Sequence, residues 1–187
     1  MRWAAALLCG VGLIAAVASA GAAEWRLVEA VSRLGFIATV EKNAAAGEFK
    51  MFSASLSFAP DTPATARLQV TVDTASADLH DPDMNAAVVA PAWLDAQAHP
   101  TAEFAASAVE RVGDEAFVAR GTLRMKGVAH AIEVPFTWQV IEHRASMVGE
   151  FALSRTAYGV GTGEWGGTDV VGDLVTVQFE LAFDAAQ

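Results

Sequence analysis

Alternation of apolar and polar residues is the feature that most constrains how this chain can fold. Every second residue from Phe52 to Phe58 is apolar, and the residues between them are serines. Between residues 175 and 181 the odd positions are apolar and the even positions are polar. A period of two residues is typical of β-strands that bury one face and expose the other. The chain is therefore predicted to be all-β.

Eight segments show this alternation. They are residues 34–40, 52–58, 66–72, 104–108, 117–125, 132–140, 147–153 and 175–183. Short connections such as Lys126-Gly127 favour antiparallel hairpins, and the lack of a strand–helix–strand rhythm disfavours a parallel sheet. Because an open sheet leaves exposed edges, we expect an eight-stranded antiparallel barrel whose interior holds side chains or one small ligand.

One Ala-rich segment, residues 82–97, breaks the alternation. Asp81 followed by Pro82 is typical of a helix start, and Pro91 ends or kinks the helix. We expect a short helix and then a second helical turn that carries Trp93 and Leu94. This segment would form a short helical lid across one barrel mouth, between strands 3 and 4.

The N-terminus has the pattern of a secretory signal peptide. Arg2 precedes an apolar run over residues 3–17, which ends at Ala18-Ser19-Ala20. The run is shorter than the ~20 residues of a transmembrane span, which disfavours the alternative of an uncleaved anchor. We expect residues 1–23 to be removed, with cleavage after Ala20 as the alternative, and residues 24–187 to form one exported domain without a stable membrane anchor.

Cysteine content and charge exclude several functions. The single cysteine, Cys9, lies in the predicted signal peptide, so disulfides and thiolate chemistry are excluded from the mature chain. The net charge of −10 disfavours binding to nucleic acids and to anionic membranes.

Motifs for catalysis are weak. Residues 161–166 match G-x-G-x-x-G, but no strand–loop–helix context surrounds them. His80 lies among aspartates without the ligand spacing of a known metal loop, and no nucleophile elbow is present. We therefore predict no catalytic residue, no metal site and no enzyme activity.

Arg155 is the one charged residue that falls on an apolar face, by parity with Phe151 and Leu153. A buried charge needs partners. Two alternatives are open: an internal salt bridge or loop-carbonyl clamp, and a polar contact for the head group of a ligand.

Several short motifs resemble those of the YceI family over nearly the whole mature chain. The stretch LSRTAYGVG at residues 153–161 resembles the I-x-R-x-x-F/Y-G-V signature, and Gly47-Glu48-Phe49 with Phe52 resembles G-x-F-x-x-F. The resemblance implies a lipocalin-like barrel in the periplasm that binds a polyisoprenoid chain, such as that of a quinone or a polyprenyl lipid. At residues 84–88 the charged residues of many members are missing, which weakens the case for a pyrophosphate ligand.

Combined with the alternation, the resemblance suggests which residues contact the ligand. The phenylalanines on inward faces would contact the tail: Phe36, Phe52, Phe104, Phe136, Phe151 and Phe179. Met84 and Trp93 would close the lid. Arg155, Tyr158 and Trp165 would lie near a mouth of the barrel.

The first hypothesis is therefore a periplasmic carrier or store for an isoprenoid lipid, with no cofactor other than a bound quinone or polyprenyl lipid, and with a homodimer as an option. The second is a structural or stress-response interaction protein with a filled barrel. The third is an enzyme acting on a small amphiphile, which requires paired titratable groups in the pocket.

Overall fold

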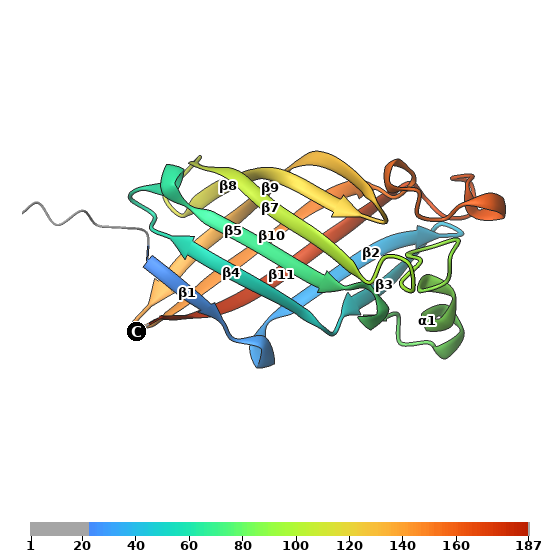
Figure 1. The fold of residues 1–187 in the computed structure, drawn as a ribbon, viewed down its shortest axis with the longest axis horizontal. Helices are drawn as coiled ribbons and strands as arrows, with labels where there is room; N and C mark the ends of the chain where they lie inside the picture. Colours follow the sequence, from blue (N-terminus) through green and yellow to red (C-terminus); the bar gives the residue numbers. More distant parts are fainter. Residues whose placement is uncertain (1–22, 187) are drawn as a thin grey trace, which may run out of the picture.

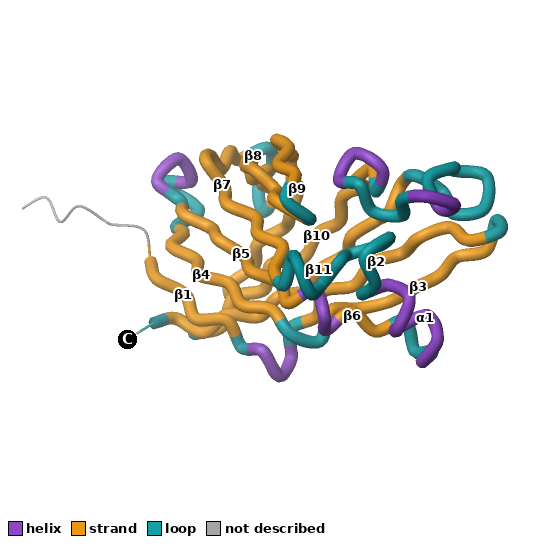
Figure 2. The backbone as a smooth tube through the Cα atoms, turned by 45° about the vertical axis from the view of Figure 1, so that its right-hand side comes forward, coloured by secondary structure: helices purple, strands orange, loops and turns teal. Residues whose placement is uncertain are grey.

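Eleven β-strands form the wall of a barrel in the computed structural model, which describes residues 23–186 (Figures 1 and 2). The predicted signal peptide, apart from Ala23, lies outside the described residues, and so does Cys9. The strands are β1 (Ala23–Leu27), β2 (Arg33–Val40), β3 (Asn43–Phe49), β4 (Phe52–Phe58), β5 (Arg67–Asp73), β6 (Ala77–Asp78), β7 (Thr101–Arg111), β8 (Ala116–Met125), β9 (Val128–Ile141), β10 (Arg144–Ser154) and β11 (Leu174–Ala185).

The sheet closes on itself through antiparallel pairs. β1 is hydrogen-bonded to β4 on one side and to β11 on the other. The ring therefore runs β1-β4-β5-β7-β8-β9-β10-β11 and returns to β1. It contains eight strands, which confirms the predicted eight-stranded antiparallel barrel.

Three strands of the ring are broken, and each has a second strand on the other side of its break. The 3-10 helix Glu29–Val31 separates β1 from β2, residues 50–51 separate β3 from β4, and the 3-10 helix Thr74–Ser76 separates β5 from β6. β2 pairs with β11 and β3, and β3 pairs with β6, so neighbours are preserved across the breaks. These strands extend the barrel at the end that carries the helix α1, which we call the lidded end (Figure 1).

Two hairpin turns have positive φ at both positions, the geometry that matches the twist of paired strands. At Lys126-Gly127 the φ angles are 50° and 77°, and at Glu41-Lys42 they are 49° and 69°. The sequence predicts the first turn from its glycine. The second turn, and with it β3, is not predicted, because Glu and Lys are not typical turn residues and the alanines of β3 show no alternation.

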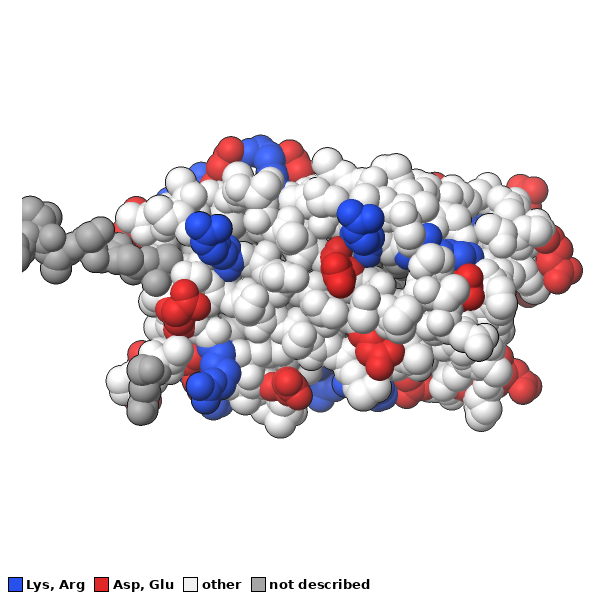
Figure 3. Space-filling view, in the orientation of Figure 1, with Lys and Arg blue, Asp and Glu red and all other residues white. Residues whose placement is uncertain are grey.

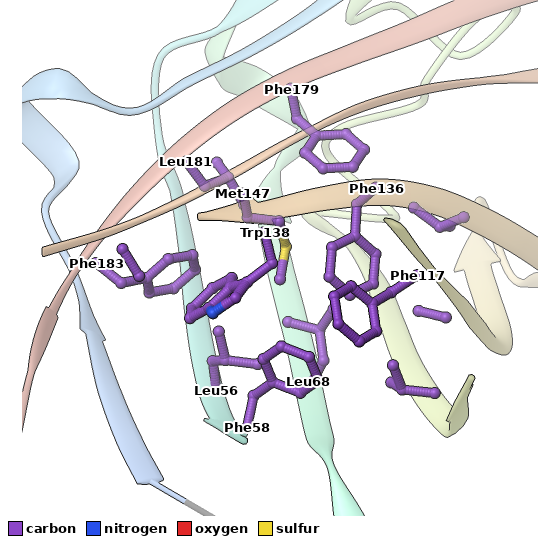
Figure 4. Packing of buried hydrophobic residues seen from close by; sticks show 14 of the residues in the cluster. Leu56, Phe58, Leu68, Phe117, Phe136, Trp138, Met147, Phe179, Leu181 and Phe183 are labelled. Atoms are coloured by element: carbon purple, nitrogen blue, oxygen red, sulfur yellow. The ribbon is translucent and has the colours of Figure 1, made fainter. Parts of the chain in front are cut away.

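Aromatic side chains fill the half of the barrel away from the lid (Figure 4). Phe58 lies edge-on to Phe117 and to Trp138, each with ring centroids 5.1 Å apart. The Nε1 of Trp25 donates to the carbonyl oxygen of Phe58 at 2.9 Å. Such T-shaped pairs contribute about 0.5–1.5 kcal/mol each beyond the burial of their area. We call this part the filled half.

The lid begins with the helix α1 (Pro82–Val88). The carboxylate of Asp81 accepts hydrogen bonds from the backbone N–H groups of Asp83 and Met84, both at 2.9 Å, and Pro82 takes the first helical position. The predicted second helical turn is instead a series of hydrogen-bonded turns over residues 90–99. Among residues 23–186, no helix is both long and apolar enough to cross a membrane.

Candidate ligand-binding site

A cavity of about 300 Å³ occupies the lidded half of the barrel. This volume is at the small end of the range for ligand pockets, roughly 300–1,000 Å³. Apolar side chains from β2, β3, β8, β10, β11, the residue after β6, the lid and the loop after β10 line it, and we call it the chamber. The lining residues are Phe36, Ala38, Val40, Ala45, Phe49, Leu79, Met84, Ala87, Val88, Trp93, Leu94, Met125, Leu153, Arg155, Val160, Trp165, Val171, Val175 and Val177.

The sizes of the inward side chains explain why one half is filled and the other is hollow. Along β11, Val175 and Val177 line the chamber, whereas Phe179 and Phe183 belong to the filled half. On β2, Ala38 leaves further space between Phe36 and the lid end. Val175 and Val177 are only half-buried although they point inward, because they face the chamber rather than other side chains.

The wall of the chamber is interrupted between β9 and β10. These strands pair only from Thr137–Ile141 to Arg144–Val148. Pro135 has no backbone N–H group to continue the pairing on this strand. The loop after β10 covers the gap: its Ala157 carbonyl oxygen lies 3.1 Å from His130 Nε2.

Arg155 organises that loop. Its side chain is 2% exposed, and its five N–H groups all donate to backbone carbonyl oxygens. Nε donates to Gly172 (2.9 Å), Nη1 to Val160 (2.8 Å) and Gly161 (3.2 Å), and Nη2 to Gly167 (2.7 Å) and Val171 (2.8 Å). Five donors are the full capacity of a guanidinium group.

This arrangement is the loop-carbonyl clamp that is one of the alternatives for Arg155. The partners come from both ends of residues 160–172, so one side chain folds this loop over the chamber. Gly161 has a φ of +75°, and a Cβ atom there would collide with Arg155 Nη1. The guanidinium carbon also lies 5.7 Å from the centre of the Trp93 ring.

Polar contacts at both ends fasten the lid. Asn85 Nδ2 donates to Asp78 Oδ1 at 2.9 Å, and the backbone N–H of Leu79 donates to Asn85 Oδ1 at 2.7 Å. The hydrogen bond from Asn85, followed by that from the His80 backbone, lowers the pKa of Asp78 from 3.8 to about 2. On the far side, Lys126 Nζ donates to the carbonyl oxygens of Pro91 and Gly159, both at 2.8 Å, and burial lowers the pKa of Lys126.

The structure brings five of the eleven predicted ligand residues to the chamber. They are Phe36, Met84, Trp93, Arg155 and Trp165. The other predicted phenylalanines belong to the filled half: Phe104, Phe136 and Phe179 are in its core, and Phe52 and Phe151 pack against it.

Tyr158 lies beside the chamber in a small buried cluster with Leu94 and Val160. Its ring stands edge-on to that of His130, with centroids 4.9 Å apart. Within the described part of the chain its hydroxyl group has no hydrogen-bond partner, and burial raises its pKa.

Sequence reasoning missed most of the aliphatic lining of the chamber. Ala38, Val40, Val175 and Val177 share faces with predicted phenylalanines, so strand parity could have found them. Residues of β3 and the loop, such as Ala45 and Val171, carry no such signal.

Within residues 23–186, one group of potential metal ligands lies outside the chamber. Oxygen or nitrogen atoms of Glu48, Asp78 and His80 lie within 4.8 Å of one another. However, Lys50 Nζ forms an ion pair with Glu48 and lies 3.4 Å from Asp78 Oδ2. The ammonium group therefore already supplies positive charge to these carboxylates.

A closed eight-stranded antiparallel barrel with an apolar chamber under a lid defines the class of lipocalin-like barrel proteins. The model of the YceI-like domain matches residues 25–183. The chain therefore belongs to the YceI family.

Solved structures share the fold. BcnA of Burkholderia cenocepacia is 34% identical, with a TM-score of 0.82 over 83% of this chain and 98% of BcnA. A polyisoprenoid binding domain from Saccharophagus degradans, implicated in plant cell wall breakdown, is 16% identical, with a TM-score of 0.70 over 88% of this chain and 99% of that domain. The YceI protein of Campylobacter jejuni is 18% identical, with a TM-score of 0.71 over 78% of this chain and 87% of that one.

A curated relative supports the same family over a shorter stretch. A UPF0312 protein of Azotobacter vinelandii is 28% identical over 88 residues. The match covers 47% of this chain and 46% of the relative, so this chain spans about half the length of that protein.

Proposed function

We propose that this protein is a periplasmic carrier or store that holds the apolar tail of an isoprenoid lipid, of quinone or polyprenyl type, in the chamber. The observation that carries the proposal is the apolar chamber itself. Among its lining residues in the described chain, only Arg155 is charged, and loop carbonyls occupy its donors. Each 100 Å² of apolar tail surface removed from water contributes about 2.5 kcal/mol.

Two further points support this ligand class. The solved domain from Saccharophagus degradans is named for polyisoprenoid binding, and the lid presents only apolar side chains to the chamber, including Met84 and Val88. We assign no reaction to the chamber.

Three expectations from the sequence stay predictions. They are export by the predicted signal peptide, the absence of a stable membrane anchor, and a homodimer.

The test is native mass spectrometry of the purified protein, followed by extraction and identification of bound lipid. Ala38→Trp fills part of the chamber, and Ala131→Trp, at an exposed position on β9, is the matched control. We expect the wild type and Ala131→Trp to carry an apolar ligand that Ala38→Trp lacks. An empty wild type that also fails to bind added farnesol would overturn the proposal.

The filled half favours a second candidate, a structural or stress-response interaction protein. Its aromatic core needs no ligand to be stable. This candidate predicts an empty protein in the same experiment, with Ala38→Trp as well folded as the wild type.

A further inference from the structure

We infer that the chamber rejects isoprenoids with anionic head groups and takes those with a neutral or cationic polar end. This inference rests on the proposed function and names the chemical class of its ligand. Two independent observations carry it: the chamber offers no free cation to an anionic group, and the rim of its mouth is acidic.

The mouth lies at α1 and Trp165, next to the place where the lid meets the loop after β10: there the backbone N–H groups of Gly161 and Thr162 donate to the carbonyl oxygen of Ala92 at 2.8 Å. Of the lining residues, Met84 and Ala87 of α1 and Trp165 of the loop are exposed to solvent, with 38% exposure for Met84 and 36% for Trp165. The opposite end of the chamber meets the aromatic core of the filled half. A tail in the chamber therefore places its polar end near Met84 and Trp165.

Three exposed segments flank this mouth. They are the Glu41-Lys42 turn, the start of α1 at residues 81–84, and the loop at residues 163–170. The backbone N–H of Glu41 donates to the carbonyl oxygen of Val170 at 2.8 Å, which joins the first segment to the third. Five exposed carboxylates in these segments form what we call the acidic rim: Glu41, Asp81, Asp83, Glu164 and Asp169.

Lys42 is the single Lys or Arg residue in these three segments. In the space-filling view, the outermost charged atoms at the lidded end are red (Figure 3). Among the other cations at this end, Arg155 and Lys126 donate to carbonyl groups, and Lys50 pairs with Glu48. Arg124, on the outer wall of the barrel, lies opposite Glu103 in the β7–β8 pair. An anionic head group would therefore meet a net negative field, because the five carboxylates of the acidic rim outnumber its one cation, Lys42.

The expected selectivity is moderate. The interaction between one exposed carboxylate and a charged head group about 10 Å away in water is weak. Salt at ~0.1 M screens this interaction further. Summed over the acidic rim, the effect corresponds to a binding preference of roughly three- to tenfold at low salt.

The test compares three ligands with one tail: farnesol, farnesyl phosphate and farnesylamine, below their aggregation limits, by isothermal titration calorimetry. We expect farnesyl phosphate to bind about three- to tenfold more weakly than farnesol at low salt, farnesylamine to bind at least as well as farnesol, and the differences to shrink at high salt. The variant Asp83→Asn/Glu164→Gln/Asp169→Asn should tighten binding of the phosphate alone.

The control variant Asp61→Asn/Asp114→Asn/Glu142→Gln removes the same number of charges from turns at the other end of the barrel. It should leave the affinities of the three ligands, and their ranking, unchanged. If farnesol binds and farnesyl phosphate binds equally well or better at low salt, the inference is wrong while the proposed function stands. If farnesol itself does not bind, the proposed function fails. An unchanged phosphate affinity in the rim variant also contradicts the inference.

Discussion

The buried Arg155 guanidinium group is surrounded by backbone carbonyl groups, to which it donates all its hydrogen bonds. Burying a cation is costly unless its hydrogen bonds are satisfied, and here all five N–H groups have partners. The residue therefore holds the shape of the loop over the chamber. Its contribution to ligand binding is the position of that loop.

Replacing Arg155 by lysine tests this role. Lysine keeps the charge but has three donors without the planar fork, so at least two buried carbonyls lose a partner. We expect a loss of about 2–4 kcal/mol in the free energy of unfolding, measured in urea. Arg124→Lys, at an exposed position, should change it by less than ~0.5 kcal/mol. Equal effects of the two substitutions would contradict the clamp.

For Tyr158, in contrast to Arg155, we expect a substitution that does not lower the free energy of unfolding. Its buried hydroxyl has no partner among the described residues, so Tyr158→Phe removes a polar group whose burial is uncompensated. We expect the free energy of unfolding to stay constant or to rise by up to ~1 kcal/mol, with farnesol affinity unchanged. A weaker affinity in this variant would show instead that the hydroxyl contacts the ligand.

At the scale of elements, the helix α1 depends on a few polar contacts, because it has no buried residue. The hydrogen bonds of Asn85 to Asp78 and Leu79 join α1 to the end of β6. The depressed pKa of Asp78, about 2 in the folded protein against 3.8 ordinarily, means that ionised Asp78 stabilises the folded state. This stabilisation is complete above the ordinary pKa and is lost as the pH falls through the folded one.

Asn85→Ala removes the largest cause of that depression. We expect the pKa of Asp78, followed by NMR titration of its carboxyl carbon, to rise from about 2 toward 3.8, and the amide of Leu79 to exchange faster with solvent. Gln97→Ala, at an exposed position on the same lid, should change neither. An unchanged pKa in Asn85→Ala would show that the bond does not form in solution.

The strands differ in how well the sequence predicts them. β4 and β8–β11 carry apolar residues on alternating positions, most of them aromatic or β-branched in β9 and β11. The existence of these strands and their inward faces therefore follow from the pattern. β1 is too short for its alternation to be recognised, and β3 consists mainly of small residues. Both form because neighbouring strands offer unpaired backbone groups, and this tertiary effect leaves no trace in local periodicity.

At the scale of the whole molecule, the alternation along each strand predicts which side chains point inward. It does not predict how far along the barrel axis each side chain lies. Phe36 and Phe179 are on inward faces of neighbouring strands, yet Phe36 lines the chamber and Phe179 packs in the filled half. The depth of each residue depends on strand stagger and on the sizes of residues from other strands. The sequence therefore predicts the barrel, its lid and the buried Arg155, but not the division into a filled and a hollow half.

The central claim is this division into a filled and a hollow half, because the hollow half leaves space for a ligand inside a small barrel. The most direct measurement is a crystal structure of the protein with farnesol. We predict electron density for the tail in the chamber, in contact with Phe36, Leu153 and Val177, with the hydroxyl group at the mouth beside Trp165 and the aromatic core unchanged. Farnesol bound only on the outer surface, above an empty chamber, would contradict the account.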